Sequence, residues 1–345
     1  MPYLKEIQDV MREAGRTKHG SKITKPMECL ADLKLWIEEH LLPDDLADVK
    51  DYTLYAVPME DEKWDELTAV ALTMKAQIDW IGQLRDNANR FAIHIDGKWK
   101  VHQGDWLLVT LGTHSTEYND ARGEVNHSFR PLMYMLTSEQ ETEKCILYLL
   151  EAFKKVAMQH HGFVPEPAAG VSDHGKGIMS AFKLAFPKAV MMGCWAHIAW
   201  GLSHGKLLPL SHPNFETVSE QIHEIQTCHT KGMWDVMVTA LAQIWGNKDK
   251  ALNDLWNSIF VYPYNNWGLW ISCGCPQILA NNNTEECYHN AGVAKGLKNQ
   301  MNATMKHVLD WSIMRIATLD GAQNHRTTYY LRIIYVLFTC YFILL

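Results

Sequence analysis

The feature that most constrains the fold is an alternating segment from Arg90 to Val101. Apolar side chains at 91, 93 and 95 alternate with smaller or polar ones, and a period of two predicts a strand with one face on a core. Asp96 then lies on the opposite face. Asp96-Gly97 allows a bend before the alternation resumes at Trp99, so the segment predicts a hairpin holding Asp96 above a rigid sheet. The alternative is that Asp96-Gly97 is merely the turn between two short strands.

Length and charge limit the possible number of domains and the possible partners. A chain of 345 residues is long enough for two domains, or for one large domain with an insertion. Apolar residues make up 47% of the chain, so a sizeable core can form. The net charge of −7 argues against broad electrostatic capture of nucleic acid, although it leaves room for a local basic groove. Acidic residues are concentrated in positions 1 to 90, so we expect any nucleic-acid face to lie elsewhere.

Cysteine usage and the two ends of the chain bear on its compartment. The 8 cysteines have irregular spacing and the first residues are charged, so we expect free thiols in a reducing compartment. The apolar run Ile333 to Leu345 is shorter than the about 20 residues of a spanning helix. It is interpreted either as an anchor or as a truncated or misread C-terminus, and we do not expect a membrane partner.

Residues 1 to 88 are predicted to form an acidic helical region. Apolar residues gather from Leu30 to Ile37, a break follows at 42–45, and a further helix is expected from about Trp64 to Arg85. Cys29 stands alone there, so no zinc-finger spacing precedes Asp96.

The segments that follow predict an α/β fold. Two further strands are expected antiparallel to the first, followed by helix, strand, helix and strand. The ranges are Asp105 to His114, Arg130 to Leu136, Glu139 to His161, Ala168 to Ser172, Gly177 to Phe186 and Ala189 to Met192. Three antiparallel strands and then αβαβ make a ribonuclease-H-like mixed sheet, which carries acids at neighbouring strand ends.

A helical insertion is expected before the last helix of this core. Amphipathic segments rich in tryptophan and methionine extend over about 210–268, and a helix is predicted from Asn283 to Leu297. The resulting domains are an N-terminal region at 1–88, a core at 89–300 that contains the insertion, and a C-terminal helix with an apolar tail at 301–345. We expect this last region to be truncated.

Three acids are candidates to converge on one site. Asp96 lies on the first strand, Asp173 follows the fourth, and Glu286 lies in the first turn of the helix after the insertion. Such carboxylates bind two Mg²⁺ or Mn²⁺ ions in enzymes that cleave phosphodiester bonds. The alternative is capping, because Asp173 precedes a helix and Glu286 follows Asn283 by three residues. Glu285 is an adjacent alternative to Glu286.

These residues resemble a family, the Mutator-like (MULE) transposase domain of the ribonuclease-H-like DDE superfamily. The resemblance covers about Phe91 to Leu297. It rests on four segments: Ile95-Asp96-Gly97-Lys98-Trp99-Lys100; Ser172-Asp173 with the helix and Phe186-Pro187-Lys188-Ala189 that follow; Cys194-Trp195-Ala196-His197; and Asn282-Asn283-Thr284-Glu285-Glu286-Cys287-Tyr288-His289. It implies that Asp96, Asp173 and Glu286 are the catalytic acids.

Cys194 and His197 would form the Cys-x-x-His element of that family. The resemblance implies that they shape the active site and contact DNA, whereas the alternative is a buried thiol and a hydrogen-bonded core histidine. We do not expect zinc, because the nearest other pair, Cys273 and Cys275, lies across the insertion.

The resemblance also implies a function and partners. We expect a metal-dependent DNA transposase core that acts on transposon ends and target DNA in the nucleus. Candidate phosphate contacts are Lys98, Lys100, Lys176, Lys295 and Lys298, each of which could equally be ordinary surface. Neither the zinc-dependent N-terminal domain nor the C-terminal SWIM-type element of full-length relatives appears. A domesticated DNA-binding or transcription regulatory protein and an inactive remnant are therefore the alternatives, and the sequence leaves the oligomeric state open, a homo-oligomer included.

Overall fold

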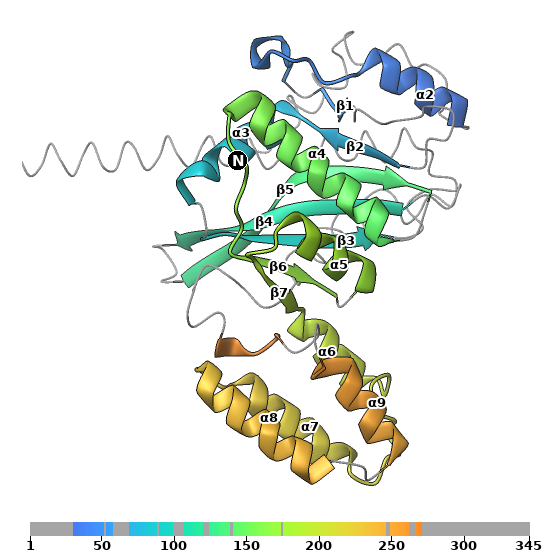
Figure 1. Cartoon of the computed structure of the whole chain (residues 1–345), viewed down its shortest axis with the longest axis vertical. Coiled ribbons are helices and arrows are strands. Elements are labelled where there is room, and N and C mark those ends of the chain that lie inside the picture. The colour runs from blue at the N-terminus through green and yellow to red at the C-terminus, as the bar shows by residue number, and fades with distance from the viewer. Residues whose placement is uncertain are drawn as a thin grey trace, which may run out of the picture.

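A computed structural model describes residues 30–51, 53–57, 69–87, 90–98, 107–119, 124–138, 141–173, 175–245, 249–261 and 266–270. Within these ranges the chain forms a mixed sheet with helices packed on it and a second, helical body (Figure 1). The predicted helix from Asn283 and the C-terminal tail lie outside the described residues.

Strands of the sheet follow the order β1-β2-β5-β4-β3-β6-β7. β3, β4 and β5 are antiparallel neighbours, whereas β6 runs parallel to β3 and β7 parallel to β6. The strands span Tyr55–Val57 (β1), Ala69–Thr73 (β2), Ala92–Lys98 (β3), Leu107–Asn119 (β4), Glu124–Thr137 (β5), Ala169–Ser172 (β6) and Val190–Gly193 (β7). The observed mixed α/β order is consistent with a ribonuclease-H-like fold.

Helices and 3-10 turns connect these strands and form the second body. They span Leu30–Glu39 (α2), Leu46–Asp48 (η1), Lys75–Gln83 (α3), Arg85–Asn87 (η3), Glu143–His161 (α4), Lys176–Ala185 (α5), Trp195–Ser203 (α6), Phe215–Gln226 (α7), Lys231–Trp245 (α8) and Lys250–Ile259 (α9).

The alternative that Asp96-Gly97 is merely the turn between two short strands is wrong. β3 runs through both residues, which pair with Thr110 and Val109 of β4. Both backbones thus join the antiparallel ladder, which satisfies their polar groups better than a free turn would. Asp96 is therefore held within a strand, with neighbours on both sides of β3.

The prediction that the N-terminal region is purely helical is also wrong. The segment predicted as one helix from Trp64 to Arg85 contains β2 as well as the shorter helix α3, and β1 pairs with β2. Residues 69–73 read Ala-Val-Ala-Leu-Thr, and the register of β2 against β5 supplies them with backbone partners. This pairing is a long-range contact, which a local periodicity does not reveal.

One face of the sheet is covered by helices α3, α4 and α5 (Figure 1). Ile93 and Ile95 point into this core and are almost completely buried. The N-terminus of α4 is capped by Thr142, whose side-chain oxygen accepts from the N–H of Cys145 at 3.3 Å, and Gly162 ends the helix with φ of 65°. The main core is thus built around the long helix α4.

The helical body lies within the predicted insertion range of 210–268. Its helices α7, α8 and α9 pack with α6 around a separate cluster whose largest buried side chains are Trp234, Trp245 and Trp267. Among the described helices, none is both long enough and apolar enough to cross a bilayer.

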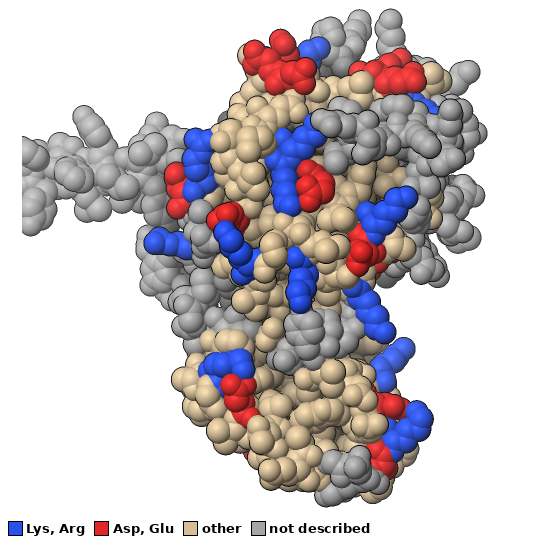
Figure 2. Space-filling model, viewed as in Figure 1, with Lys and Arg blue, Asp and Glu red and all other residues tan. Residues whose placement is uncertain are grey.

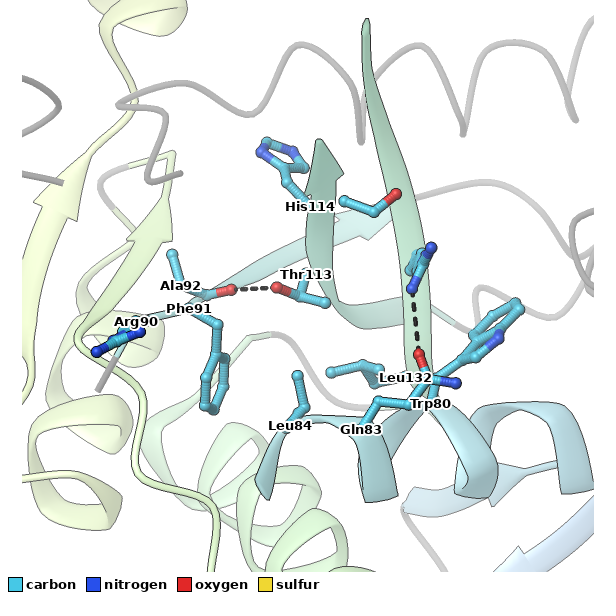
Figure 3. A pocket seen from close by; sticks show the side chains of 11 residues that line it. Trp80, Gln83, Leu84, Arg90, Phe91, Ala92, Thr113, His114 and Leu132 are labelled. Atoms are coloured by element: carbon cyan, nitrogen blue, oxygen red, sulfur yellow. Dashed lines mark hydrogen bonds between the residues drawn. The ribbon is translucent and has the colours of Figure 1, made fainter. Parts of the chain in front are cut away.

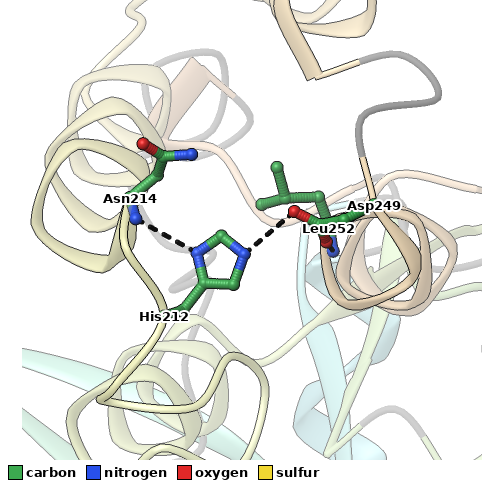
Figure 4. Close-up of polar contacts among 4 residues, drawn as sticks. All are labelled: His212, Asn214, Asp249 and Leu252. Atoms are coloured by element: carbon green, nitrogen blue, oxygen red, sulfur yellow. Dashed lines mark hydrogen bonds and ion pairs between the residues drawn. The ribbon is translucent and has the colours of Figure 1, made fainter.

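His212 joins the N-terminal ends of two helices in this body (Figure 4). Its Nδ1 accepts from the backbone N–H of Asn214 at 3.2 Å, and its Nε2 donates to Asp249 Oδ2 at 3.0 Å. The other oxygen of Asp249 accepts from the N–H of Leu252 and caps α9. These bonds hold the start of α9 against the turn that leads into α7.

Candidate functional site

The C-terminal ends of β3 and β6 bring two predicted acids to one edge of the sheet. These strands are parallel, with His94 opposite Val171, so the register continues to place Asp96 beside Asp173. Burial raises the pKa of Asp173, and the charge of Asp96 raises it further. The two carboxylates are therefore near enough to repel each other.

Two groups partly offset this repulsion at Asp173. Its Oδ1 accepts from the backbone N–H of Gly175 at 3.1 Å, and His197 contributes a favourable electrostatic interaction that also lowers the pKa. The N-cap of α5 is Gly175, not Asp173. Asp173 thus forms a short Asx-type bond in the turn before α5, and the alternative that it is the N-cap of this helix is wrong.

Glu141 is a third acid at this edge, and the sequence analysis did not single it out. It precedes Thr142, the N-cap of α4. Its pKa is raised to about 7, first by burial and then by the charges of Asp173 and Asp96. The carboxyl group therefore belongs to the same electrostatic cluster as the two aspartates.

Two glycines make room for Glu141. A Cβ atom at Gly97 would overlap the Glu141 carboxylate, and one at Gly177 would overlap its backbone oxygen. The available sequence signal was Gly97 itself, because a glycine inside a strand often marks a close approach by another segment. Which segment approaches could not be read from the sequence.

Cys194 and His197 lie at the start of α6, beside the same edge. Cys194 is buried, serves as N-cap, and donates its backbone N–H to the carbonyl of Ser172 at 2.8 Å. His197 lies one turn later, where it acts electrostatically on Asp173. The motif therefore connects β6, β7 and α6 next to the acids.

The helical body returns the chain to this edge. The carbonyl of Asn266 accepts from the N–H of Gly193 at 2.9 Å, and the Asn266 side chain donates to the carbonyl of Met191 at 3.2 Å. The end of the predicted insertion thus lies beside the end of β7. Glu286 and Glu285 lie further along the chain, outside the described residues.

Of the candidate lysines, Lys176 is exposed at the first position of α5. Lys98 lies in β3, whereas Lys100, Lys295 and Lys298 fall outside the described residues. Figure 2 shows basic and acidic side chains interspersed over one face of the molecule, without a continuous basic patch on that face.

The two aspartates have the donor chemistry for a hard divalent ion, since Mg²⁺ and Mn²⁺ prefer carboxylate oxygens. Burial first and the charges of the neighbouring acids second raise the pKa values of Asp173 and Glu141, and a cation would relieve the repulsion among these charges. Within the described ranges, no three His, Cys, Asp or Glu side chains form a group arranged to hold a metal ion. Cys273 and Cys275 also fall outside these ranges.

Comparisons with known proteins give little further information. No family model matches the chain, and no curated protein matches it. A Drosophila P element transposase strand transfer complex is similar to the chain at a TM-score of 0.36 and 10% sequence identity, over 92% of this chain and 98% of that one.

Proposed function

We propose that the chain is the catalytic core of a DNA transposase of the Mutator-like, DDE type. In this proposal Asp96 and Asp173 bind divalent metal, Mg²⁺ or Mn²⁺, and Glu286 completes the site. Bound metal ions would activate the attacking water or 3′-hydroxyl and stabilise the leaving oxygen during cleavage and strand transfer. Such a protein acts on transposon ends and target DNA, and its place would be the nucleus.

The observation that carries the proposal is the meeting of Asp96 and Asp173. They come from parallel strands joined through two other strands and a helix, yet the register of β3 with β6 places them side by side. Structural ion pairs join opposite charges, whereas this edge gathers like charges and half-buries them. Carboxylates held together at such a cost are typical of sites that bind a cation or move a proton.

The path of the insertion supports Glu286 as the third acid. The chain leaves the sheet at Cys194 and comes back at Asn266, both bonded to the ends of β6 and β7. The helical body therefore brings the chain back to this edge at Asn266. Glu286 follows at a chain distance that can reach this edge, given a maximum span of roughly 3.3 Å per residue.

Two side chains and one backbone N–H at the edge would assist without binding metal in this proposal. His197 offsets the negative charge of Asp173, and the N–H of Gly175 fixes the orientation of that carboxylate. Glu141, which lies next to Gly97, adds negative potential when it is ionised. Together they position the two aspartates and set their affinity for positive charge.

The proposal is tested by Mg²⁺- or Mn²⁺-dependent nicking and strand transfer on DNA. Asp96→Asn, Asp173→Asn and Glu286→Gln should each reduce the rate by more than the roughly 100-fold that follows loss of an outer-shell partner. Asp79→Asn is the matched control, because Asp79 lies on α3 and pairs with Lys75 at 2.8 Å. It should leave the rate unchanged.

Two results would reject this mechanism. One is cleavage that survives all three substitutions at the acids. The other is DNA binding without cleavage, equally strong in wild type and in the three variants, which would favour the domesticated regulatory protein. A chain that neither binds nor cleaves DNA would favour the inactive remnant.

A further inference from the structure

Trp200 is an exposed aromatic side chain on the helix α6. Its side chain is 51% exposed, and every other tryptophan within the described ranges is buried or half-buried. Trp80, which lines a cavity between α3 and the sheet (Figure 3), is only 4% exposed, and Trp267 is completely buried. Trp200 therefore offers a large aromatic surface to a ligand, which the buried rings cannot do.

Two neighbouring side chains contact the Trp200 ring. The imidazole of His204 stacks on it with ring centroids 4.6 Å apart and an interplanar angle of 27°. The Nζ of Lys206 lies 5.6 Å from the centre of the indole ring, which is within the range of a cation–π interaction. With both neighbours in place, about half of the Trp200 surface is still exposed. We call Trp200, His204 and Lys206 the Trp200 platform.

The end of α6 fixes the geometry of the Trp200 platform. Gly205 has φ of 67°, a conformation that favours glycine. Its N–H donates to the carbonyl of Leu202 at 2.9 Å, and the N–H of Lys206 donates to the carbonyl of Gly201 at 2.8 Å. These two bonds define a Schellman motif, which packs the residue after the glycine against the last turn of the helix. The backbone therefore directs the stem of Lys206 back onto Trp200.

His204 is held in place by a hydrogen bond of its own. Its Nδ1 donates to the carbonyl of Trp200 at 2.9 Å, which orients the imidazole over the indole. Because both contacts of the indole are set by the end of α6, the Trp200 platform is formed before any ligand binds. A surface that is formed in advance costs less conformational entropy on binding.

The helix that carries the Trp200 platform also reaches the acidic edge (Figure 1). α6 begins at Cys194, which is bonded to the end of β6, and His197 on its first turn interacts electrostatically with Asp173. His197 and Trp200 are three residues apart, so their Cβ atoms are about 5–6 Å from each other on the helix surface. A nucleic-acid strand at the acids would therefore pass within reach of Trp200.

The charge of Lys206 is available to a phosphate group. Within the described residues, no carboxylate pairs with Lys206, which is exposed. Lys231 provides a comparison, because its Nζ also lies 5.6 Å from an indole ring, that of Trp270. Lys231 forms an ion pair with Asp235, however, and Trp270 is half-buried. An aromatic surface and a free positive charge thus occur together at Trp200 and not at Trp270.

We propose that the Trp200 platform binds an unpaired base of the DNA strand that leads to the acids. Trp200 stacks on the base, and Lys206 contacts the adjacent phosphate. This inference rests on the proposed function, because the acids are the reason to expect DNA at this edge. Every base has an aromatic face, so the platform is expected to tolerate any sequence. A base inside a duplex is already stacked on its neighbours, so the partner is a single-stranded stretch.

Binding is measured by fluorescence anisotropy with the full chain and a labelled single-stranded oligonucleotide, in EDTA so that no cleavage occurs. Trp200→Ala should weaken binding by about 5- to 150-fold, which is the usual effect of losing one stacked base. Trp200→Phe should restore most of the affinity, because a phenyl ring also stacks. Lys206→Ala should lower the slope of log K against log salt by about 0.7, the value for one phosphate contact on a single strand.

Lys231→Ala is the matched control, and it should change neither the affinity nor the salt slope. Two further ligands separate stacking from charge. An oligonucleotide with abasic sites keeps its phosphates, so wild type should bind it about as weakly as Trp200→Ala binds the normal strand. A blunt duplex of the same sequence should bind wild type and Trp200→Ala equally. Thermal unfolding verifies that Trp200→Ala folds normally.

The inference is overturned if wild type does not bind the single strand, if Trp200→Ala binds it as tightly as wild type, or if the abasic strand binds as well as the normal one. The proposed function survives these results if Asp96→Asn still abolishes metal-dependent nicking. Conversely, binding that depends on Trp200 in a chain that does not nick DNA supports the Trp200 platform and rejects the proposed cleavage.

Discussion

The sheet and the helical insertion keep their structures by different means. In the described part of the sheet, seven strands share backbone hydrogen bonds, and mostly aliphatic side chains, together with methionines and with Phe153 and Phe182, fill the space under α3, α4 and α5. In the insertion, short helices pack around aromatic rings, with Trp267 stacked 5.3 Å from Trp195 and 4.7 Å from Trp234 in an edge contact. The two hydrophobic clusters are separate.

This difference between the two regions indicates which of them can hold a reactive site. A hydrogen-bonded sheet holds its strand ends rigidly enough to keep like charges such as Asp96 and Asp173 together against their repulsion. In the aromatic insertion, the contact between His212 and Asp249 instead joins a basic side chain to an acidic one. We therefore expect substitutions in the insertion to affect stability, and those at the sheet edge to affect the electrostatics of the site.

The largest expected effect is a loss of stability in the insertion that leaves the sheet unchanged. Trp267 is completely buried, and its Nε1 donates to the carbonyl of Ile259 at 2.7 Å. Trp267→Ala should destabilise the insertion by about 3–5 kcal/mol, because it leaves a cavity and an unpaired carbonyl. Differential scanning calorimetry should show an early transition for the insertion while the sheet melts as in wild type.

Trp200→Ala is the control for this substitution. Trp200 is 51% exposed on α6, so its removal should change stability by less than about 0.5 kcal/mol. A single transition shifted as a whole by Trp267→Ala would show instead that the two clusters unfold as one unit.

Substituting one matched glycine in each region compares the sheet with the insertion directly. Gly177 and Gly232 are each the second residue of a helix, α5 and α8. Gly177→Ala should destabilise the protein by about 1–3 kcal/mol, because its Cβ meets the backbone oxygen of Glu141. Gly232→Ala meets no atom within 4 Å and should stabilise the protein by up to about 1 kcal/mol. Urea denaturation measures both, and equal effects would contradict the close approach at Gly177.

Glu141 gives the sheet edge a pH dependence. Because its pKa is raised from 4.5 to about 7, the folded chain keeps a proton that the unfolded chain releases. The free energy of unfolding should therefore fall as the pH rises from about 4.5 to 7, and this loss of stability should be complete above pH 7. Glu141→Gln removes this penalty and should stabilise the protein at pH 8 by on the order of 1–2 kcal/mol, with little change at pH 4.

Chemical denaturation of both proteins across this pH range measures the effect of Glu141→Gln. Glu151→Gln is a suitable control, since Glu151 pairs with Lys154 on the same helix α4 and is partly exposed. The difference in free energy of unfolding between wild type and Glu141→Gln should change between pH 5 and 8. A constant difference would refute the clustering of the three acids.

The smallest effect concerns the bond between His212 and Asp249. The N–H of Leu252 and then His212 lower the pKa of Asp249, so their stabilisation is present above its ordinary value of 3.8 and is lost as the pH falls through the lowered value. His212→Ala should lower the melting temperature of the insertion slightly at pH 7. Circular dichroism should show wild type and variant converging once the pH falls below the lowered pKa of Asp249. A difference that persists in acid would assign the effect to packing of the imidazole ring alone.

Sequence patterns predicted the centre of the fold because they are local. The alternation around Asp96 and the apolar stripe of α4 follow from the periods of strand and helix. The predicted order of three antiparallel strands, helix, strand, helix and strand is confirmed, and the described part of the predicted insertion contains the helices α7, α8 and α9.

Predictions failed where the deciding partner was distant in the chain. Residues 69–73 are a strand because β5 offers them backbone partners, and Asp96-Gly97 stays in β3 because β4 pairs with both residues. Glu141 was overlooked for the same reason. Its neighbours Asp96, Gly97, Asp173 and Gly177 come from other elements of the fold.

The sequence by itself determined which segments could be strands and helices, and which acids stand at their ends, because side-chain period and turn chemistry act over a few residues. Only the tertiary structure decided that Glu141 joins Asp96 and Asp173, and that Trp200 is exposed whereas Trp267 is buried. Electrostatic and packing interactions depend on distances between elements, and these distances are set when the sheet pairs and the helices pack onto it.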